Sequence, residues 1–410
     1  MLVIKLNIFQ TLAAAILVFY IGVILKRHIS FFDKYCIPSP LIGGFVFAIV
    51  NCFLYVNGFW QYSQDKIMNE FFMNLFFTSL GYSASLKTGK SLFQTGSALV
   101  AKMTFIVTVL IALQDFLGVT LAKAFGLNPL LGLATGSIPM VGGHGTAGAF
   151  GPVLESVGLD NATTIAFAAA TFGLIAGGII GGPIANRLIR KYHLVSEATL
   201  EGVKLAKGEE TTKSDENIPV GVTVDENRFM NAFAHLLLAM GLGTIITAGV
   251  NRLGVTVPSY VGSMFMAAIL RNLIDSTQLC KSYQQEGTVL GSLGLNLFLS
   301  LALMGMKLWH LAYLAVPFMV ILLSQTVLMA LFATFVTFNV MGKDYEAAVM
   351  AAGNCGFGLG ATPNALANMK AITERFGPAP TAFFVIPLVG ALLIDVINTG
   401  IIILFINVLK

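Results

Sequence analysis

Charged side chains are scarce in this sequence. Asp, Glu, Lys and Arg make up only 11% of its 410 residues, and 56% are hydrophobic. Roughly a quarter of the residues are charged in soluble domains, so the shortage excludes an ordinary soluble domain. With a mean hydropathy of +0.82, the composition predicts an all-α polytopic protein embedded in a lipid bilayer. The net charge of +4 is small and gives no reason to expect a nucleic-acid partner.

Cysteine is also rare. The four cysteines are scattered and lie mostly inside apolar runs, which excludes a disulfide framework and a zinc site. No arrangement of nucleophile and base is visible, so the sequence predicts neither an enzyme nor a bound cofactor. No small-residue cleavage site follows the apolar run from Ile8 to Leu25. We therefore expect that run to span the membrane rather than to act as a signal peptide.

Long apolar runs dominate the rest of the chain. Runs of about 20 residues can cross a bilayer as helices. Each half of the chain offers five of them, near 7–26, 37–56, 70–87, 95–122 and 161–188, and near 229–250, 256–273, 288–306, 311–340 and 379–408. The polar stretch 194–227 is predicted to be a solvated linker, which divides the chain into a first unit, 1–193, and a second, 228–410.

A Gly-rich motif occurs late in each half. The first copy reads Ser137-Ile-Pro-Met-Val-Gly-Gly-His-Gly-Thr146 and the second Asn354-Cys-Gly-Phe-Gly-Leu-Gly-Ala-Thr-Pro363. They lie in apolar stretches, 129–156 and 345–376, that are too interrupted for one span but long enough for two half-membrane arms. We expect each stretch to form a re-entrant hairpin. A duplicated, Gly-broken apolar segment is typical of secondary transporters that bind their substrate between two repeats.

Shorter matches recur in the same order. Ile37-Pro-Ser resembles Val257-Pro-Ser, and Asn74-Leu-Phe resembles Asn296-Leu-Phe, at nearly the offset of the two Gly-rich motifs. An offset that stays nearly constant indicates internal duplication. Because five spans is an odd number, the second half must enter the membrane from the opposite side. The sequence therefore predicts two inverted-topology repeats of five transmembrane helices, each with a Gly-rich re-entrant hairpin.

Basic residues predict the orientation. With the N-terminus outside, most Lys and Arg residues of the loops fall on the cytoplasmic side, and the outer loops and ends receive Lys5, Lys66, Lys123, Arg252, Lys307 and Lys410. This asymmetry follows the positive-inside rule. Both termini are then outside and the linker is cytoplasmic. The first hairpin enters from outside and the second from the cytoplasm, and we expect their tips to meet near the middle of the membrane.

The broken tips are suited to binding an anion. Broken helices leave backbone N–H groups without intrahelical partners, glycine lets a ligand approach the backbone, and helix N-termini favour anions. The residues predicted to contact the substrate are Ser137, Gly142, Gly143, His144, Gly145, Thr146, Asn354, Cys355, Gly356, Gly358, Gly360, Thr362, Asn364 and Arg375. The alternative is that glycines only permit close helix packing, which is the better interpretation for Gly177, Gly178, Gly181 and Gly182.

Two of these side chains have open alternatives. His144 could donate to a substrate carboxylate or take part in proton transfer, or it could only bond a neighbouring carbonyl. Arg375 could clamp a carboxylate with two hydrogen bonds or act as a cytoplasmic anchor.

A coupling cation needs oxygen ligands. Unwound carbonyls and helix C-termini bind Na⁺ in such transporters. Asp395, an ionisable group in an apolar run, could ligate Na⁺ together with Asn398, or it could pair with a buried Lys or Arg. Thr171 could offer a hydroxyl to the cation or bond its own helix. Asp115 lies toward the end of its span and is interpreted as interfacial.

Longer motifs permit a comparison with known families. They are Gly142-Gly-His-Gly-Thr146, Gly353-Asn-Cys-Gly-Phe-Gly-Leu-Gly-Ala-Thr-Pro363, Ile372-Thr-Glu-Arg-Phe-Gly-Pro378 and Leu303-Met-Gly-Met-Lys-Leu-Trp309. Over nearly the whole chain, the sequence resembles the bacterial sodium/glutamate symporters of the glutamate:sodium symporter family. The resemblance implies Na⁺-coupled uptake of L-glutamate across the bacterial inner membrane. It also implies a homodimer with two inverted five-helix domains that works by an elevator-like movement.

The chain departs from the family pattern in two places. Asn354 stands where the family commonly has His, and Pro139-Met-Val141 replaces a more polar stretch. Asn keeps a donor and an acceptor but does not titrate near neutral pH. Another dicarboxylate or amino acid as substrate, or H⁺ as the coupling ion, therefore stays open. A passive channel with a filter made by the hairpins is a further alternative, and a membrane sensor or scaffold is disfavoured because no soluble signalling domain is visible.

Overall fold

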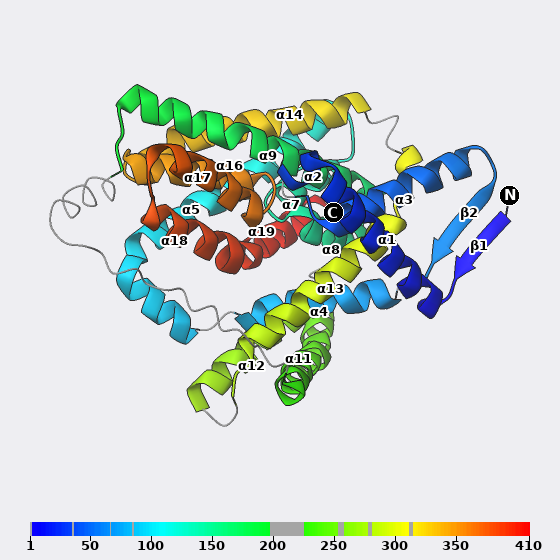
Figure 1. The fold of residues 1–410 in the computed structure, drawn as a ribbon. Helices are drawn as coiled ribbons and strands as arrows, with labels where there is room; N and C mark the ends of the chain where they lie inside the picture. The colour runs from blue at the N-terminus through cyan, green and yellow to red at the C-terminus, as the bar shows by residue number, and fades with distance from the viewer. Residues whose placement is uncertain are drawn as a thin grey trace.

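The computed structural model describes residues 2–34, 37–65, 67–83, 86–196, 225–252, 258–277, 281–310 and 315–410, and most of these are helical (Figure 1). The first half contains β1 (Leu2–Leu6), α1 (Ile8–His28), α2 (Ser30–Lys34), α3 (Ser39–Val56), β2 (Trp60–Gln64), α4 (Ile67–Ser83), α5 (Leu86–Ala124), α6 (Leu130–Ala134), α7 (Ser137–Met140), α8 (Gly143–Ser156) and α9 (Ala162–Tyr192). Most of the predicted linker, 197–224, lies outside the described residues.

The second half is almost entirely helical. It contains α11 (Glu226–Arg252), α12 (Ser259–Thr277), α13 (Gln284–Met304), a 3₁₀ turn (Leu308–His310), α14 (Ala315–Phe332), α15 (Phe338–Val340), α16 (Tyr345–Gly358), α17 (Thr362–Phe376), α18 (Pro380–Leu388) and α19 (Ile394–Leu409). Two π-helical turns interrupt it, Ala333–Thr337 after α14 and Val389–Leu393 after α18. Such turns are often found at functional sites.

Helices lie at every position predicted as a span. Within the described ranges, seven are long and apolar enough to cross a membrane: Ile8–His28, Ser39–Val56, Ala98–Ala124, Ala162–Tyr192, Glu226–Arg252, Gln284–Met304 and Ala315–Val340. The last predicted span is split into α18 and α19. Pro387 lies at the end of α18, just before the π-helical turn Val389–Leu393 that separates α18 from α19. The chain is therefore a multi-pass helical membrane protein.

A small parallel sheet was not anticipated from the sequence. β1 pairs with β2 in the register Leu2↔Trp60 to Leu6↔Gln64. Asn7 ends the strand and begins α1 with a capping box, in which Asn7 and Gln10 each accept a backbone N–H from the other. The sheet joins the start of α1 to the end of α3 at one edge of the molecule (Figure 1).

The helices pack into two bundles, each made from both halves of the chain (Figure 1). In bundle A, α4 packs on α12 and α13, α11 on α12, and α1 on α3. In bundle B, α9 packs on α8, α16 and α17, while α5 packs on α6, α14 and α19. Both Gly-rich segments belong to bundle B. The two bundles meet where α13 contacts α8 and where α12 contacts α5.

Helix α9 carries glycines where the second Gly-rich segment comes closest. A Cβ atom at Gly173 would lie only 2.2 Å from the carbonyl oxygen of Leu359, and Gly177 and Gly181 are covered in the same way by α16 and α17. These glycines follow one another at intervals of four residues and so share one face of α9. The close-packing interpretation is thus confirmed for Gly177 and Gly181, where α16 and α17 lie directly on the α9 backbone, and it is wrong for Gly182, where an added Cβ would have nothing within 4 Å.

Candidate functional site

The first Gly-rich segment is a series of short helices with breaks between them. The stretch predicted as a hairpin over 129–156 contains α6, α7 and α8, and nearly all of its residues up to Gly151 are buried. Gly143 opens α8 with φ +60°, in the left-handed region that side chains disfavour. The preceding residue, Gly142, provides no side-chain cap to α8. The first N–H groups of α8 therefore lack a capping side chain.

A buried carboxylate holds the start of α7. Asp115 on α5 accepts a hydrogen bond from the Ser137 backbone N–H at 2.7 Å and another from the Ser137 hydroxyl at 2.9 Å. Both side chains are fully buried. The interpretation of Asp115 as interfacial is therefore wrong. It is a positioning residue, and an acidic residue inside an apolar run was the available signal in the sequence.

Asn398 approaches the same break from α19. Its amide Nδ2 donates to the carbonyl oxygen of Ser137 at 3.3 Å. Its Oδ1 atom is buried and has no hydrogen-bond partner. Asp395 lies three residues earlier, so both side chains project from the same side of α19. Within the described part of the chain, Asp395 forms neither an ion pair nor a hydrogen bond, so the structure provides no paired Lys or Arg for it.

His144 forms a hydrogen bond with Thr171, and both were predicted to belong to the site. Its Nε2 atom lies 3.0 Å from Thr171 Oγ1. The Thr171 hydroxyl donates its one hydrogen to the carbonyl oxygen of Phe167 at 3.0 Å, so it must accept from an Nε2–H of His144. His144 Nδ1 is then left as an acceptor in a buried place at the beginning of α8. The Thr171 hydroxyl thus accepts a hydrogen bond from His144 of α8 and donates one to a carbonyl of its own helix.

The second Gly-rich segment is a helical hairpin. α16 ends at Gly358, and α17 begins at Thr362 after the extended residue Ala361, which provides no side-chain cap. Asn364 near the start of α17 donates through Nδ2 to the Leu174 carbonyl on α9. These contacts hold the beginning of α17 next to α9, as α8 is held by Thr171.

The two Gly-rich segments touch at their breaks. A Cβ atom at Gly143 would lie 2.8 Å from the carbonyl oxygen of Gly360. Gly143 begins α8, and Gly360 lies in the turn that precedes α17. The predicted meeting of the two segments is therefore present, and it places two uncapped helix N-termini close together.

The remaining predicted residues divide into those near this contact and those away from it. Thr146 is buried in the first turn of α8, with its Oγ1 2.4 Å from where a Cβ on Gly142 would be. Thr362 faces the π-helical turn, because its Oγ1 would lie 3.3 Å from a Cβ on Gly390. Gly145 is covered by Phe76 of bundle A.

Three other predicted residues lie inside α16. Gly356 packs against the start of α17, and the carbonyl of Cys355 packs against α9. Asn354 is fully buried, and its Nδ2 donates to Thr337 Oγ1 on the π-helical turn after α14 at 2.8 Å. Asn354 therefore faces α14 rather than the tip.

Arg375 is not brought to the tips. It is exposed in the last turn of α17, with its guanidinium over the ring of Phe376. It lies 13 positions after Thr362, or about 20 Å along a helix. In this arrangement Arg375 cannot contact a ligand that also contacts Thr362, and the anchor alternative fits its position.

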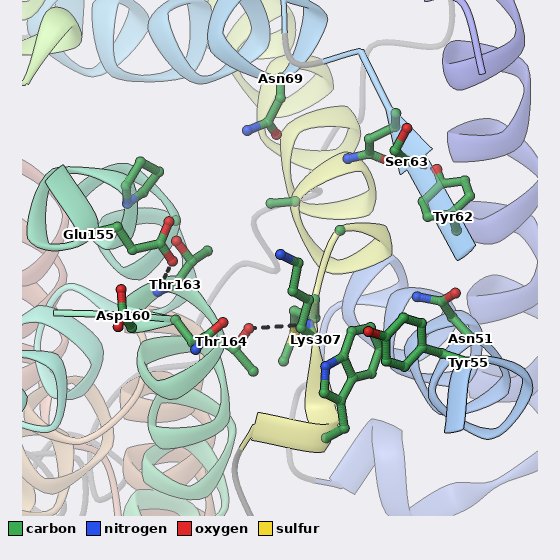
Figure 2. Close-up of a pocket in the computed structure, with 18 of the residues that line it drawn as sticks. Asn51, Tyr55, Tyr62, Ser63, Asn69, Glu155, Asp160, Thr163, Thr164 and Lys307 are labelled. Carbon is green, nitrogen blue, oxygen red and sulfur yellow. Dashed lines mark hydrogen bonds between the residues drawn. The ribbon is translucent and has the colours of Figure 1, made fainter. Parts of the chain in front are cut away.

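A cavity of about 860 Å³ lies between the two bundles. Bundle A lines it with residues of α3, β2, α4 and the turn after α13, and bundle B with residues of α8 and the start of α9. Lys307 extends into the space in Figure 2, opposite Glu155 and Asp160. Gly148 is the lining residue of α8 nearest to Gly143, about 8 Å from it along the helix.

Aromatic side chains pack against α8 between the cavity and the tip contact. Phe298 would lie 2.5 Å from a Cβ on Gly148, and Phe76 would lie 3.2 Å from a Cβ on Gly145. Both phenylalanines come from bundle A. Phe298 and Phe76 of bundle A thus cover α8 at Gly148, which lines the cavity, and at Gly145, which lies closer to the tip contact.

The site consists of neutral oxygens, backbone N–H groups and the carboxylates of Asp115 and Asp395, which form no ion pair within the described residues. Within the ranges that the structure describes, no three His, Cys, Asp or Glu side chains gather into a metal-binding group. Anions suit the N-termini of α8 and α17, and a hard monovalent cation suits oxygen ligands such as those of Asp395 and Asn398.

Known proteins resemble this chain over nearly its whole length. The sodium/glutamate symporter of Escherichia coli (strain K12) is 39% identical over 401 residues, covering 98% of this chain and 97% of that protein. The sodium/glutamate symporter of Haemophilus influenzae (strain ATCC 51907 / DSM 11121 / KW20 / Rd) is 36% identical over 393 residues, covering 96% and 95%. The profile of the sodium/glutamate symporter family matches residues 4–378. The chain therefore belongs to the sodium/glutamate symporter family.

Proposed function

We propose that this protein is a Na⁺-coupled symporter that imports L-glutamate. The observation that carries the proposal is the contact between two uncapped helix N-termini, at Gly143 and beside Gly360, in a chain of this family. Relatives that match nearly the full length are named sodium/glutamate symporters. The protein's role is transport rather than catalysis.

The substrate carboxylates bind at the beginnings of α8 and α17. Helix N-termini supply N–H donors and a favourable dipole, each worth up to about 1 kcal/mol for a nearby anion at exposed sites and more when buried. The hydroxyls of Thr146 and Thr362 add donors at the two helix starts, and His144 Nδ1 is an acceptor for the substrate ammonium group.

A coupling Na⁺ binds between Asp395 and Asn398. Support comes from the unpartnered Oδ1 of Asn398 and from the Asp395 carboxylate one turn away on the same side of α19. Asn398 also contacts Ser137, so a cation there stabilises the break of the first Gly-rich segment. Inward movement of one net positive charge gains about 2.3 kcal/mol per 100 mV of inside-negative potential. Thr171 is left out of this cation site because it bonds His144.

We also propose how the chain crosses the membrane and which bundle moves. The units 1–193 and 228–410 are inverted repeats, and the two Gly-rich segments are re-entrant hairpins that enter from opposite sides of the inner membrane. Both termini are outside. Bundle B, which holds both segments, moves against bundle A, which forms the contact of a homodimer. The meeting of the bundles at few helices supports this division.

The test is uptake of radiolabelled L-glutamate by purified protein in liposomes. An inward Na⁺ gradient should drive accumulation above the external concentration, whereas a K⁺ gradient should not. Accumulation also excludes a passive channel, because a channel cannot concentrate its solute. Accumulation that requires a pH gradient, or another dicarboxylate, would contradict the proposal and support the proton-coupled or dicarboxylate alternative.

A further inference from the structure

Three buried amide side chains are linked, directly or through Gln114, to the end of α16. Gln114 on α5 donates through Nε2 to the carbonyl oxygen of Gly358 at 2.8 Å. Gln325 on α14 donates through Nε2 to the backbone carbonyl of Gln114 at 2.8 Å. Asn354 Oδ1 would lie 3.5 Å from a Cβ on Gly358. We call Gln114, Gln325 and Asn354 the amide cluster, and all three are fully buried.

The orientation of two of these amides follows from their partners. Gln114 and Gln325 both face backbone carbonyl oxygens, which can only accept. The NH₂ group must therefore point toward the carbonyl in each case, and a flipped amide would bring two acceptors together. The two Oε1 atoms therefore point away from these carbonyl oxygens. A flip of the amide that would put an NH₂ group in the place of Oε1 is ruled out.

All three amide oxygens lack a donor. Gln114 Oε1, Gln325 Oε1 and Asn354 Oδ1 are buried and without a hydrogen-bond partner. Buried polar groups are nearly always satisfied in folded proteins, and three unsatisfied acceptors on amides that are linked to the end of α16 need a common explanation. A bound cation explains them, because it accepts electron density from several oxygens at once.

The surroundings favour a cation of single charge. Gly358 ends the 14-residue helix α16, and a helix C-terminus carries a partial negative charge. The cluster supplies neutral oxygens and no carboxylate, which suits Na⁺ better than a divalent ion. Apolar atoms of Leu110 and Met329 would lie 3.2 Å and 2.8 Å from a Cβ on Gly358, so the cluster borders apolar side chains. We propose that the amide cluster binds a monovalent cation, Na⁺, at a position separate from Asp395 and Asn398.

This site joins the elements that hold both Gly-rich segments. Gln114 contacts the end of α16, while the adjacent residue Asp115 holds the start of α7. Gln325 ties α14 to the same point of α5. Na⁺ bound to the cluster therefore stabilises the turn that contacts Gly143. The inference rests on the proposed function and assigns part of its Na⁺ dependence to these residues.

The experiment measures Na⁺-dependent thermal stability of the purified full-length protein without glutamate. Choline replaces Na⁺ at constant ionic strength, and K⁺ is a parallel series. We expect Na⁺ to raise the unfolding temperature of the wild type and K⁺ to raise it much less. Gln325→Met, which keeps the length of the side chain, should raise the half-saturating Na⁺ concentration roughly tenfold, as expected for one lost ligand to a charged group.

Asn368→Leu is the matched control. Asn368 also donates its amide hydrogens to buried backbone carbonyls, of Gly177 at 2.9 Å and Ala352 at 3.2 Å, but its oxygen is not among the unpartnered buried atoms of the described residues. The Asn368→Leu variant should be less stable than the wild type but should have the same half-saturating Na⁺ concentration. If Gln325→Met does not fold, Asn354→Leu takes its place. This variant loses a hydrogen bond to the Thr337 hydroxyl and leaves every backbone carbonyl with its partner.

The outcomes separate this inference from the proposed function. An unchanged Na⁺ titration in Gln325→Met, or an equal shift in Asn368→Leu, overturns the cation site while Na⁺-driven glutamate uptake by the wild type stays intact. K⁺ that stabilises the protein as well as Na⁺ overturns the assignment to Na⁺. Absence of Na⁺-driven uptake by the wild type in liposomes instead overturns the proposed function.

Discussion

Replacing Gly143 with Ala tests whether the contact between the two Gly-rich segments forms the substrate site. Gly143 has φ +60°, and an added Cβ would lie 2.8 Å from the carbonyl oxygen of Gly360. The new methyl group would therefore strain the backbone of α8 and push the turn before α17 away. Both helix starts that are proposed to hold the substrate would be displaced relative to each other.

The magnitude follows from these two effects. An L-residue in the left-handed region costs about 1–2 kcal/mol more than glycine. The steric contact adds to this cost, because a Cβ only 2.8 Å from a backbone oxygen forces one of the two backbone segments to shift. A total of about 2 kcal/mol, applied to the state in which the two segments meet, corresponds to roughly a 30-fold loss of glutamate affinity.

The assay compares Gly143→Ala with Gly182→Ala. Gly182 lies inside α9 with nothing within 4 Å of its added Cβ, so alanine there should leave transport unchanged and favour the helix slightly. The half-saturating glutamate concentration for uptake in liposomes is measured for both variants at saturating Na⁺. Folding is checked by size-exclusion chromatography and thermal unfolding. A folded Gly143→Ala variant with wild-type affinity would refute the assignment of the substrate to this contact.

The other predictions concern single side chains. Asp115→Ala should lower stability by about 3 kcal/mol, because the buried N–H and hydroxyl of Ser137 lose their acceptor; Asp115→Asn should cost less, and a thermal unfolding series that finds both neutral contradicts the bonding. Asp395→Asn should raise the Na⁺ concentration for half-maximal uptake, and an unchanged Na⁺ dependence removes Asp395 from the cation site. Arg375→Ala should transport like the wild type, since the side chain is exposed far from the tips, and a large rise in KM would argue for a role in binding. Lys307→Gln should slow uptake more at low than at high ionic strength, because its charge in the cavity attracts anionic substrate; equal slowing at both salt concentrations speaks against steering.

Local patterns were enough to predict the helices and the two Gly-rich segments. A span is recognised from the length and apolarity of one continuous run, and helices occur at each predicted position. Helix breaks were predictable from Gly and Pro, as in the segment around Gly143 and at the turn before Pro363. These features depend on neighbours within a few residues.

Side-chain partners were predicted less well. Asp115 was interpreted as interfacial, yet it bonds Ser137 from a helix 22 residues away. Arg375 looked suited to a carboxylate, but α17 carries it away from the tip. No sequence pattern marks Gln114 and Gln325, because a polar residue in an apolar run does not reveal which helix it will face.

The sequence by itself determined that this is a helical membrane protein with two Gly-broken segments, because backbone groups in a bilayer must be satisfied within helices and glycine interrupts them. It also determined the family, through motifs that extend over nearly the whole chain. Only the tertiary structure decided which helices form each bundle, that Gly143 meets Gly360, and which polar atoms stay unpartnered. Those outcomes depend on packing between residues hundreds of positions apart, and the hydropathy of a single run contains no information about its neighbours in space.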